Sequence, residues 1–219
     1  MFATDCIFRE IIDKLHLCAE VQRCGASPRS GQEWKLKKLK TTIYIASTID
    51  GFIARPDGTI DWLEHDSKGQ DYGWAAFRQS IDALVLGRQT YEQVLGFGVD
   101  WPYRGLATFV WSRTLTNDDI PPALADDVVE ASALPPAALL DELAGRGLRS
   151  VWIDGGQTLQ SFLAEGLVDI ITVTRVPILI GRGIPLFGHL PNDVHLEHVD
   201  TQSFDSGVVQ SSYAVRKSA

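Results

Sequence analysis

Two stretches of this 219-residue chain have residue types that suit phosphate binding. Each combines a strand-like apolar run, a glycine-containing turn and the start of a helix: VLGRQT at residues 85–90 and WIDGGQT at residues 152–158. A helix N-terminus carries free N–H groups and a partial positive charge, and glycine lets the backbone approach a ligand. Turn geometry alone also explains either glycine, but two such motifs in one chain favour an anion-binding edge. The candidate residues are Gly87, Arg88, Gln89, Thr90, Gly155, Gly156, Gln157 and Thr158.

A third stretch, VWSR at residues 110–113, ends a predicted strand with a hydroxyl and a guanidinium. Ser112 and Arg113 suit an additional phosphate, because both donate hydrogen bonds and arginine adds a positive charge. In α/β sheets, ligands bind at the carboxyl ends of the strands. The three stretches therefore predict one ligand site at that edge of a sheet.

The elements that must position these motifs begin at about residue 41. Apolar and β-branched runs predict strands, and the segments between them predict helices. The predicted strands are 41–48, 83–87, 106–112, 128–132, 150–155 and 169–179, and the predicted helices are 71–80, 88–96, 135–147 and 157–166. Residues 195–217 predict a hairpin around Asp205-Ser206-Gly207. Strands separated by helices imply a mainly parallel sheet, so we expect a three-layer α/β/α domain with an antiparallel C-terminal hairpin.

Composition limits the domain count and the class of partner. The chain is 45% hydrophobic, which is enough for one substantial core over residues 41–219. Residues 1–40 carry 8 basic and 5 acidic residues, which leaves 12 basic and 23 acidic residues in the remainder. This acidic body argues against a nucleic-acid partner. Residues 1–40 are predicted to be an N-terminal extension: an amphipathic helix over 5–23 followed by a linker.

Cysteine usage and hydropathy bear on metal binding and location. Cys6, Cys18 and Cys24 all lie in the extension, and with His16 they fall short of a complete zinc ligand set, so we expect no metal. The rest of the chain has no thiol, which suits the cytoplasm. No apolar run reaches membrane-spanning length, and charged residues interrupt any signal-peptide core, so we expect no membrane association.

The motifs VLGRQTYEQV, FVWSRTL and VWIDGGQTLQSFL resemble the cofactor-binding framework of dihydrofolate reductase. IYIASTIDGFIA and LVDIITVTRVPILIGRGIPLF resemble still more closely the C-terminal reductase domain of the bacterial riboflavin-biosynthesis deaminase-reductase. The similarity runs in order from about Thr41 to Ala214. The Gly-x-Gly-x-x-Gly fingerprint of Rossmann folds is absent, and so is the zinc deaminase motif before Thr41. The chain thus resembles stand-alone members of the family, with a dihydrofolate reductase-like fold.

The resemblance implies NADPH as the cofactor. It places Gly87 to Thr90 and Gly155 to Thr158 near the pyrophosphate, with Gly155 and Gly156 also near the nicotinamide. It places Ser112 and Arg113 beside the adenosine 2′-phosphate, where Arg88 also contributes charge. Ala46 and Ile53 match positions that line the nicotinamide pocket.

The implied reaction is hydride transfer to an electron-poor C=N or C=O carbon, and three carboxylates are candidate proton sources. Asp71 opens a predicted helix, Asp50 lies in the Ile-Asp-Gly loop, and Asp61 precedes Trp62 in a loop that could close over the cofactor. Each also has a purely structural interpretation, as a helix N-terminal acid or a turn carboxylate. Trp74 and Phe77 could flank a planar substrate ring or simply pack in the core.

The substrate is less defined than the fold. The family default is 5-amino-6-(5-phosphoribosylamino)uracil, and a pterin or another small heterocycle competes with it. Phe52 stands where the riboflavin reductase usually has lysine, and Asp154 stands where it has glutamate. A protein that binds NADPH without turnover, with a sensing or assembly role, is the alternative. Family members commonly pair through their sheets, so a homodimer is expected, with residues 170–179 as a candidate edge strand limited by Pro177.

Overall fold

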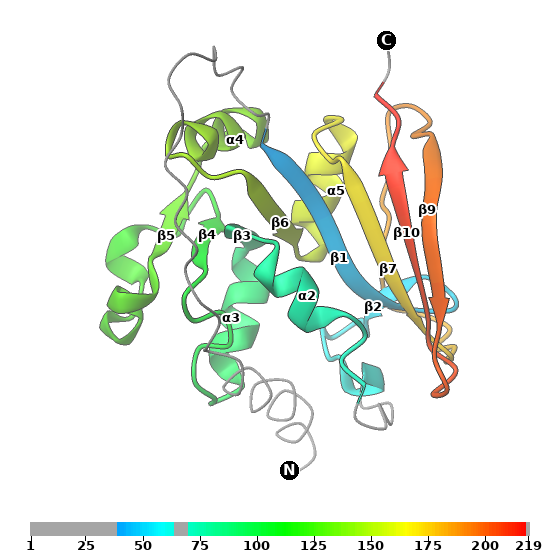
Figure 1. Ribbon diagram of the computed structural model, residues 1–219. Coiled ribbons are helices and arrows are strands. Elements are labelled where there is room, and N and C mark those ends of the chain that lie inside the picture. Colours follow the sequence, from blue (N-terminus) through cyan, green and yellow to red (C-terminus); the bar gives the residue numbers. More distant parts are fainter. Residues whose placement is uncertain (1–38, 64–69, 218–219) are drawn as a thin grey trace, which may run out of the picture.

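The computed structural model describes residues 39–63 and 70–217, and its main feature is one eight-stranded sheet (Figure 1). The strand order is β5-β4-β3-β6-β1-β7-β10-β9. These strands are β1 (Lys40–Thr48), β3 (Ala83–Gly87), β4 (Ala107–Trp111), β5 (Val129–Ser132), β6 (Ser150–Asp154), β7 (Ile170–Val176), β9 (Leu196–Ser203) and β10 (Val209–Val215). Two short strands, β2 (Phe52–Ala54) and β8 (Ile184–Pro185), pair separately.

The strands from β5 to β7 in the sheet order are mutually parallel, and β10 and β9 add an antiparallel hairpin. This arrangement confirms the predicted fold class. The predicted edge position of residues 170–179 is wrong. β7 ends at Val176 and lies between β1 and β10, because the C-terminal hairpin folds back and pairs along it. The edges of the sheet are β5 and β9.

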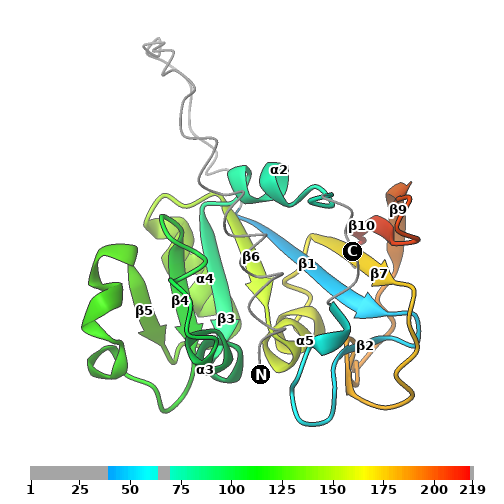
Figure 2. The same cartoon turned by 90° about the horizontal axis from the view of Figure 1, so that it is seen from below.

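Helices cover both faces of the sheet and give three layers. The α-helices are α2 (Trp74–Gln79), α3 (Arg88–Gly96), α4 (Pro136–Gly145) and α5 (Gly156–Ala164), and the short 3-10 helices are η1 (Asp61–Leu63), η2 (Asn117–Asp119) and η3 (Pro122–Asp127). Figure 2, seen from below, shows α2 standing apart from the row of strands on one side. The predicted helix over residues 5–23 lies outside the described residues.

Two cores, one on each face, result from the alternation of side chains along the strands. Val85 and Ile153 face α4 and α5, where Leu139 and Phe162 belong to the same cluster. Leu84, Leu86, Tyr91, Val94 and Trp152 form the other cluster, which contains the side chains of α3 and is flanked by those of α2. The sheet therefore holds α3 and α5 on opposite faces, with the first turns of both helices at its carboxyl edge.

Within the part of the chain that the structure describes, no helix has both the length and the apolarity needed to cross a membrane.

Candidate functional site

A cleft of about 1000 Å³ lies at the carboxyl ends of the parallel strands. β1 contributes Ala46, β2 contributes Ile53, and the starts of α3 and α5 contribute further lining. Its lining includes Tyr44, Ala46, Ile53, Trp74, Gln89, Thr90, Tyr103, Trp152, Asp154, Gly155, Gly156 and Gln157. The structure thus brings Ala46, Ile53, Trp74 and parts of both glycine motifs to one place.

The first turns of α3 and α5 fit into one another through their glycines. A Cβ built on Gly87 would lie 2.5 Å from Thr158 Oγ1, and one built on Gly155 would lie 2.6 Å from Thr90 Oγ1. Gly155 also has φ +88°, a conformation that L side chains rarely adopt. Gly87 and Thr158 therefore lie against each other beneath the site, outside the cleft lining. The close approach at Gly87 is by a threonine of the chain, whereas sequence reasoning had assigned it to a ligand.

Both helix starts have the chemistry that a diphosphate requires. Within the described residues, neither α3 nor α5 has a side-chain hydrogen bond at its N-cap, and neither has an acidic residue in its first turn. Backbone N–H groups are thus left for an anion at each helix N-terminus, apart from that of Gly155, which bonds the Asp154 carboxylate. Gln89 and Thr90 from α3, and Gly156 and Gln157 from α5, line the cleft at these points. The residues present fit the phosphates of a dinucleotide.

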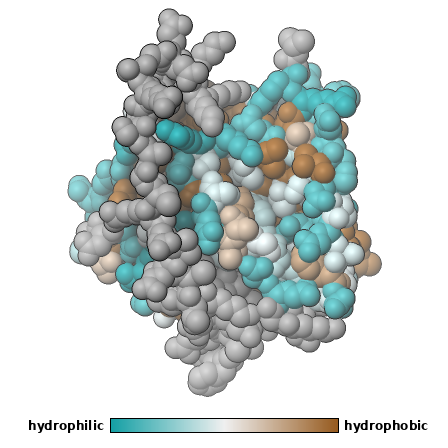
Figure 3. All heavy atoms as spheres, in the orientation of Figure 1, coloured by the Kyte–Doolittle hydropathy of each residue, from teal (hydrophilic) through white to brown (hydrophobic). Residues whose placement is uncertain are grey.

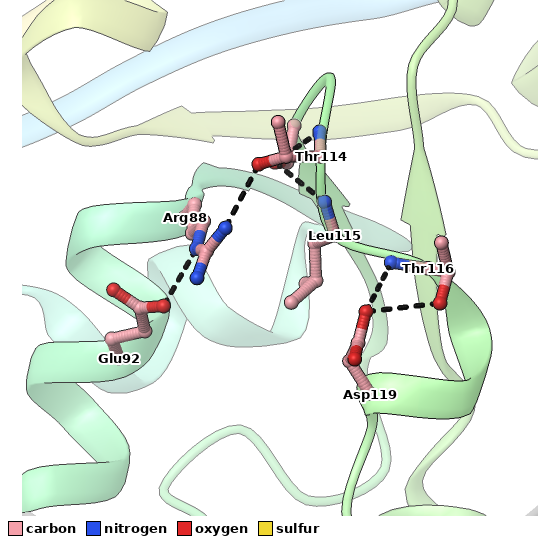
Figure 4. A network of polar contacts seen from close by, with 7 residues as sticks. Arg88, Glu92, Thr114, Leu115, Thr116 and Asp119 are labelled. Atoms are coloured by element: carbon pink, nitrogen blue, oxygen red, sulfur yellow. Dashed lines mark hydrogen bonds and ion pairs between the residues drawn. The ribbon is translucent and has the colours of Figure 1, made fainter.

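Arg88, Ser112 and Arg113 lie next to the start of α3 but do not line the cleft. Arg88 Nε donates to Glu92 Oε1 at 2.6 Å, and its Nη1 donates to Thr114 Oγ1 at 2.8 Å (Figure 4). Ser112 Oγ accepts from the backbone N–H groups of Thr114 and Leu115 and so stabilises the turn after β4. Arg113 is exposed. A 2′-phosphate bound here would lie on this rim and would compete with Glu92 for Arg88.

The three carboxylates predicted as proton sources do not line the cleft, which corrects the sequence-based assignment. Asp50 accepts hydrogen bonds from Thr48 Oγ1 and from the N–H groups of Ile180 and Gly181, so it joins two loops. The Thr48 hydroxyl, followed by these backbone donors, lowers the pKa of Asp50. A carboxyl with a lowered pKa is ionised near neutral pH and holds no proton to give.

Asp61 and Asp71 are likewise occupied in structural contacts. Asp61 forms an ion pair with Arg55, whose guanidinium donates hydrogen bonds that lower the Asp61 pKa. Asp71 accepts from the N–H groups of Gly73 and Ala75 at 3.0 and 3.1 Å and so caps the start of α2. This is the helix N-terminal interpretation of Asp71.

Asp154 is the carboxyl that sequence reasoning missed. It lies at the end of β6, is half-buried, and lines the cleft beside Gly155. Burial raises the Asp154 pKa to about 6, although the Gly155 N–H bond to the carboxylate opposes this effect. A carboxyl of this kind can hold a proton near neutral pH. Strand alternation was the available signal, because it places Asp154 on the same face as Trp152.

Aromatic side chains form the wall of the cleft nearest α2. Trp74 and Trp152 meet edge to face with ring centroids 5.2 Å apart, and Tyr103 meets Trp152 in the same way at 5.6 Å. Tyr44 stacks on Phe77 at 4.1 Å. Phe77, which sequence reasoning had placed at the substrate, lies outside the lining and supports Tyr44 from behind.

The segment from Pro56 to Leu63 forms the opposite wall. Pro56, Asp57, Gly58, Thr59, Ile60 and Leu63 line the cleft. Gln93 on α3 donates from Nε2 to the Gly58 carbonyl at 2.9 Å, and this bond holds the segment against the helix. The wall therefore has a defined position in the structure.

Comparison with known proteins places the chain in a family. The model of the RibD C-terminal domain matches residues 40–210. The Bacillus subtilis protein YwjB, which is uncharacterised, is 34% identical over 170 residues that cover 77% of this chain and 94% of YwjB. A solved structure of a putative riboflavin biosynthesis protein from Shewanella sp. PV-4 is 34% identical to this chain, with a TM-score of 0.76. The match covers 82% of this chain and the whole of that protein.

A more distant solved structure shares the fold. It is the Thermotoga maritima diaminohydroxyphosphoribosylaminopyrimidine deaminase/5-amino-6-(5-phosphoribosylamino)uracil reductase, with 18% identity and a TM-score of 0.65. The match covers 82% of this chain and 57% of that protein. The family match spans every strand except most of β10, together with the two helix starts and the cleft, so the chain belongs to the RibD C-terminal domain family.

Proposed function

We propose that the protein is an NADPH-dependent reductase of a small heterocycle. The observation that carries this proposal is the meeting of two uncapped helix N-termini at one cleft, with Gly155 and Gly156 between them and the predicted nicotinamide positions Ala46 and Ile53 in the same lining. Family membership supports reductase chemistry, and 5-amino-6-(5-phosphoribosylamino)uracil is the family's default substrate.

NADPH bound in the cleft would supply a hydride to the substrate. The N-termini of α3 and α5 would hold its diphosphate, and Arg88 with Arg113 would hold the 2′-phosphate at the rim. The cleft walls align the two reactants and limit the access of water, which contributes much of the rate enhancement in such reactions.

Asp154 is proposed to handle the proton. Hydride addition to a C=N or C=O carbon leaves negative charge on the nitrogen or oxygen, which takes a proton. The neutral Asp154 carboxyl gives that proton and becomes a carboxylate, which solvent protonates again. Because burial raises the Asp154 pKa to about 6, about a tenth of the carboxyl is still protonated at pH 7 and can give the proton.

Calorimetric titration with NADPH and NADH tests the cofactor assignment. We expect the protein to bind NADPH more tightly than NADH, because only NADPH carries the 2′-phosphate that Arg88 and Arg113 would hold. Arg113→Ala should weaken NADPH binding by about tenfold and leave NADH binding within about twofold, since one charge-assisted hydrogen bond to a phosphate contributes about 1.5–3 kcal/mol.

Arg149→Ala is the matched control, because Arg149 lies just before β6, at the opposite end of that strand from the cleft. Equal losses of NADPH and NADH binding in Arg113→Ala would remove Arg113 from the 2′-phosphate site. NADPH binding without oxidation by any pyrimidine, pterin or flavin precursor would instead favour a binding protein without turnover.

A further inference from the structure

A row of side chains on one face of the sheet leads from the C-terminal hairpin to the aromatic wall of the cleft. Gln210 of β10 lies opposite Thr174 of β7, and Thr174 lies opposite Ala46 of β1. Residues opposite one another share a face of the sheet, so Gln210 lies on the same face as Tyr44, two residues before Ala46. Tyr44 lines the cleft and Gln210 does not. Gln210 can therefore reach a ligand only through Tyr44 or the residues around it.

The Gln210 carboxamide is a hydrogen-bond donor shared by three elements. Its Nε2 lies 2.9 Å from the Tyr44 hydroxyl, 3.0 Å from the Tyr72 carbonyl and 2.8 Å from Thr174 Oγ1. The Tyr44 hydroxyl donates to the same Tyr72 carbonyl at 2.6 Å. Because a carbonyl only accepts, the nitrogen of the carboxamide must be the end that faces Tyr72. Gln210 thus joins β1, β7 and the turn before α2.

The turn before α2 has a conformation that its surroundings must maintain. Tyr72 has φ +51°, which residues other than glycine rarely adopt, and Gly73 has φ +81°. The Tyr72 ring meets Phe204 edge to face at 4.9 Å, and its hydroxyl donates to Ser206 Oγ at 3.0 Å. A strained residue persists only where its neighbours fix it. Gln210 and the hairpin turn therefore fix the point from which α2, with Trp74 as its first residue, begins.

Tyr44 connects this network with the rest of the aromatic wall. Its ring stacks on Phe77 at 4.1 Å and lies 6.1 Å from that of Trp74, and its carbonyl accepts from Trp152 Nε1 at 3.2 Å. Ala46, the predicted nicotinamide position, follows on the same face of β1. Hydride transfer requires close alignment of the two reactants, and a misplacement of about 1 Å lowers a rate by about 100-fold even when the mutation is remote.

We propose that Gln210 is a positioning residue for the reductase reaction. Its N–H groups fix Tyr44 and the Tyr72 carbonyl, and through them the aromatic wall against which the substrate ring lies. This inference rests on the proposed function and deepens it, because it extends the working part of the molecule from the cleft to β10.

Three variants of the full-length chain separate donation from shape. Gln210→Glu keeps the shape but loses the donors, whereas Gln210→Lys keeps donors, and each changes the charge by one unit. Gln202→Glu is the matched control, because Gln202 is exposed and lies opposite Gln210 on β9. Thermal denaturation checks that each variant is folded. Gln210→Met, which has neither donor nor charge, replaces Gln210→Glu if that variant does not fold.

Fluorine NMR of the protein labelled with 5-fluorotryptophan measures the position of the wall directly. The chain has six tryptophans, and replacement by phenylalanine assigns the resonances of Trp74, Trp152 and Trp111. We expect Gln210→Glu to shift the Trp74 and Trp152 resonances and Gln210→Lys to bring them back toward the wild type. Trp111, which packs on Phe162 in the other core, should not shift. Unchanged Trp74 and Trp152 resonances, or equal shifts in Gln202→Glu, would overturn the inference.

NADPH oxidation with 5-amino-6-(5-phosphoribosylamino)uracil as acceptor measures the consequence for the reaction. Gln210→Glu should lower kcat by about tenfold or more and leave the KM for NADPH within about twofold, because the phosphate end of the cleft is untouched. Gln210→Lys should recover most of the loss, and Gln202→Glu should match the wild type. Shifted resonances with an unchanged kcat would overturn the positioning role. A wild-type protein that does not turn over this compound would contradict the substrate in the proposed function, and the fluorine spectra alone would then decide the role of Gln210.

Discussion

The carboxyl of Asp154 differs from the other acidic side chains near the cleft in what surrounds it. Asp50, Asp61 and Asp71 each accept hydrogen bonds that stabilise their charge or hold backbone N–H groups. Asp154 is half-buried beside Trp152, and burial is the larger influence on its pKa. The same residue type therefore serves structure in three places, and in the fourth we propose it for proton transfer.

Replacement of Asp154 should show how much the buried carboxylate lowers the free energy of unfolding. Its pKa is raised from 3.8 to about 6, so the unfolded chain ionises more easily, and stability falls as the pH rises from 3.8 through 6. We expect Asp154→Asn to raise the unfolding free energy by about 1–3 kcal/mol at pH 7.5 and by progressively less toward pH 4. Urea denaturation across this range measures the effect. A gain that does not vary with pH would contradict the role of ionisation, and Asp141→Asn controls for surface charge.

The sequence predicted the turns whose signals are local: Gly87 ends β3, Gly155 follows β6, and a helix begins directly after each. It did not predict what these glycines lie against, because Thr158 and Thr90 are far along the chain from Gly87 and Gly155. The role of Asp50 depends on Ile180 and Gly181, about 130 residues away, so no local pattern could reveal that its carboxylate was already occupied. The edge position of residues 170–179 failed for the same reason, since the pairing of β7 with β10 is a long-range contact. Arg88 was identified, but its ion pair with Glu92 was not.

At the scale of elements, the contact between the first turns of α3 and α5 sets the geometry of the phosphate end. Thr158 occupies the space beside Gly87, and Thr90 occupies the space beside Gly155. Each helix start therefore limits how closely the other approaches. The two glycines differ in one respect, because Gly155 has a positive φ and Gly87 does not.

Because of this difference, removing the neighbouring threonine should restore stability to different extents in the two glycine variants. Gly87→Ala should destabilise the protein by about 1–3 kcal/mol through overpacking against Thr158, and adding Thr158→Ala should recover most of the loss. Gly155→Ala should lose a similar amount, but adding Thr90→Ala should recover only part, because the strain at φ +88° remains. Thermal denaturation of the wild-type protein and the six variants, including the two single threonine variants, gives both coupling energies. Full recovery in the Gly155 pair would show that sterics alone explain that glycine.

At the scale of the whole molecule, β9 is an edge strand, and no other strand of the described residues pairs with its outer side. All eight of its residues are exposed, and Val199 is 58% exposed. Figure 3 shows apolar residues among polar ones on the side of the molecule where β7, β10 and β9 lie. Open edge strands readily pair with another strand. We propose that the chain forms a homodimer through β9, as the family resemblance also implies.

Size-exclusion chromatography with light scattering tests this pairing. The wild-type protein should have twice the mass of one chain, and Val199→Lys should shift it toward a monomer, because a charge would replace an apolar contact at the edge. Leu134→Lys, at an exposed position near the other edge strand, should leave the dimer intact. A wild-type monomer at all concentrations would contradict the proposal, and an unchanged Val199→Lys dimer would place the interface elsewhere.

The aromatic wall also gives the cleft an optical property. Trp74 and Trp152 lie in the lining with their rings 5.2 Å apart, so a ligand that enters must change the surroundings of two indoles at once. Intrinsic fluorescence should therefore report occupancy without a label, and Trp74→Phe should remove much of the signal while Trp101→Phe, buried behind Tyr103, should not. Collections of heterocycles can thus be screened for binding by the change in tryptophan emission alone.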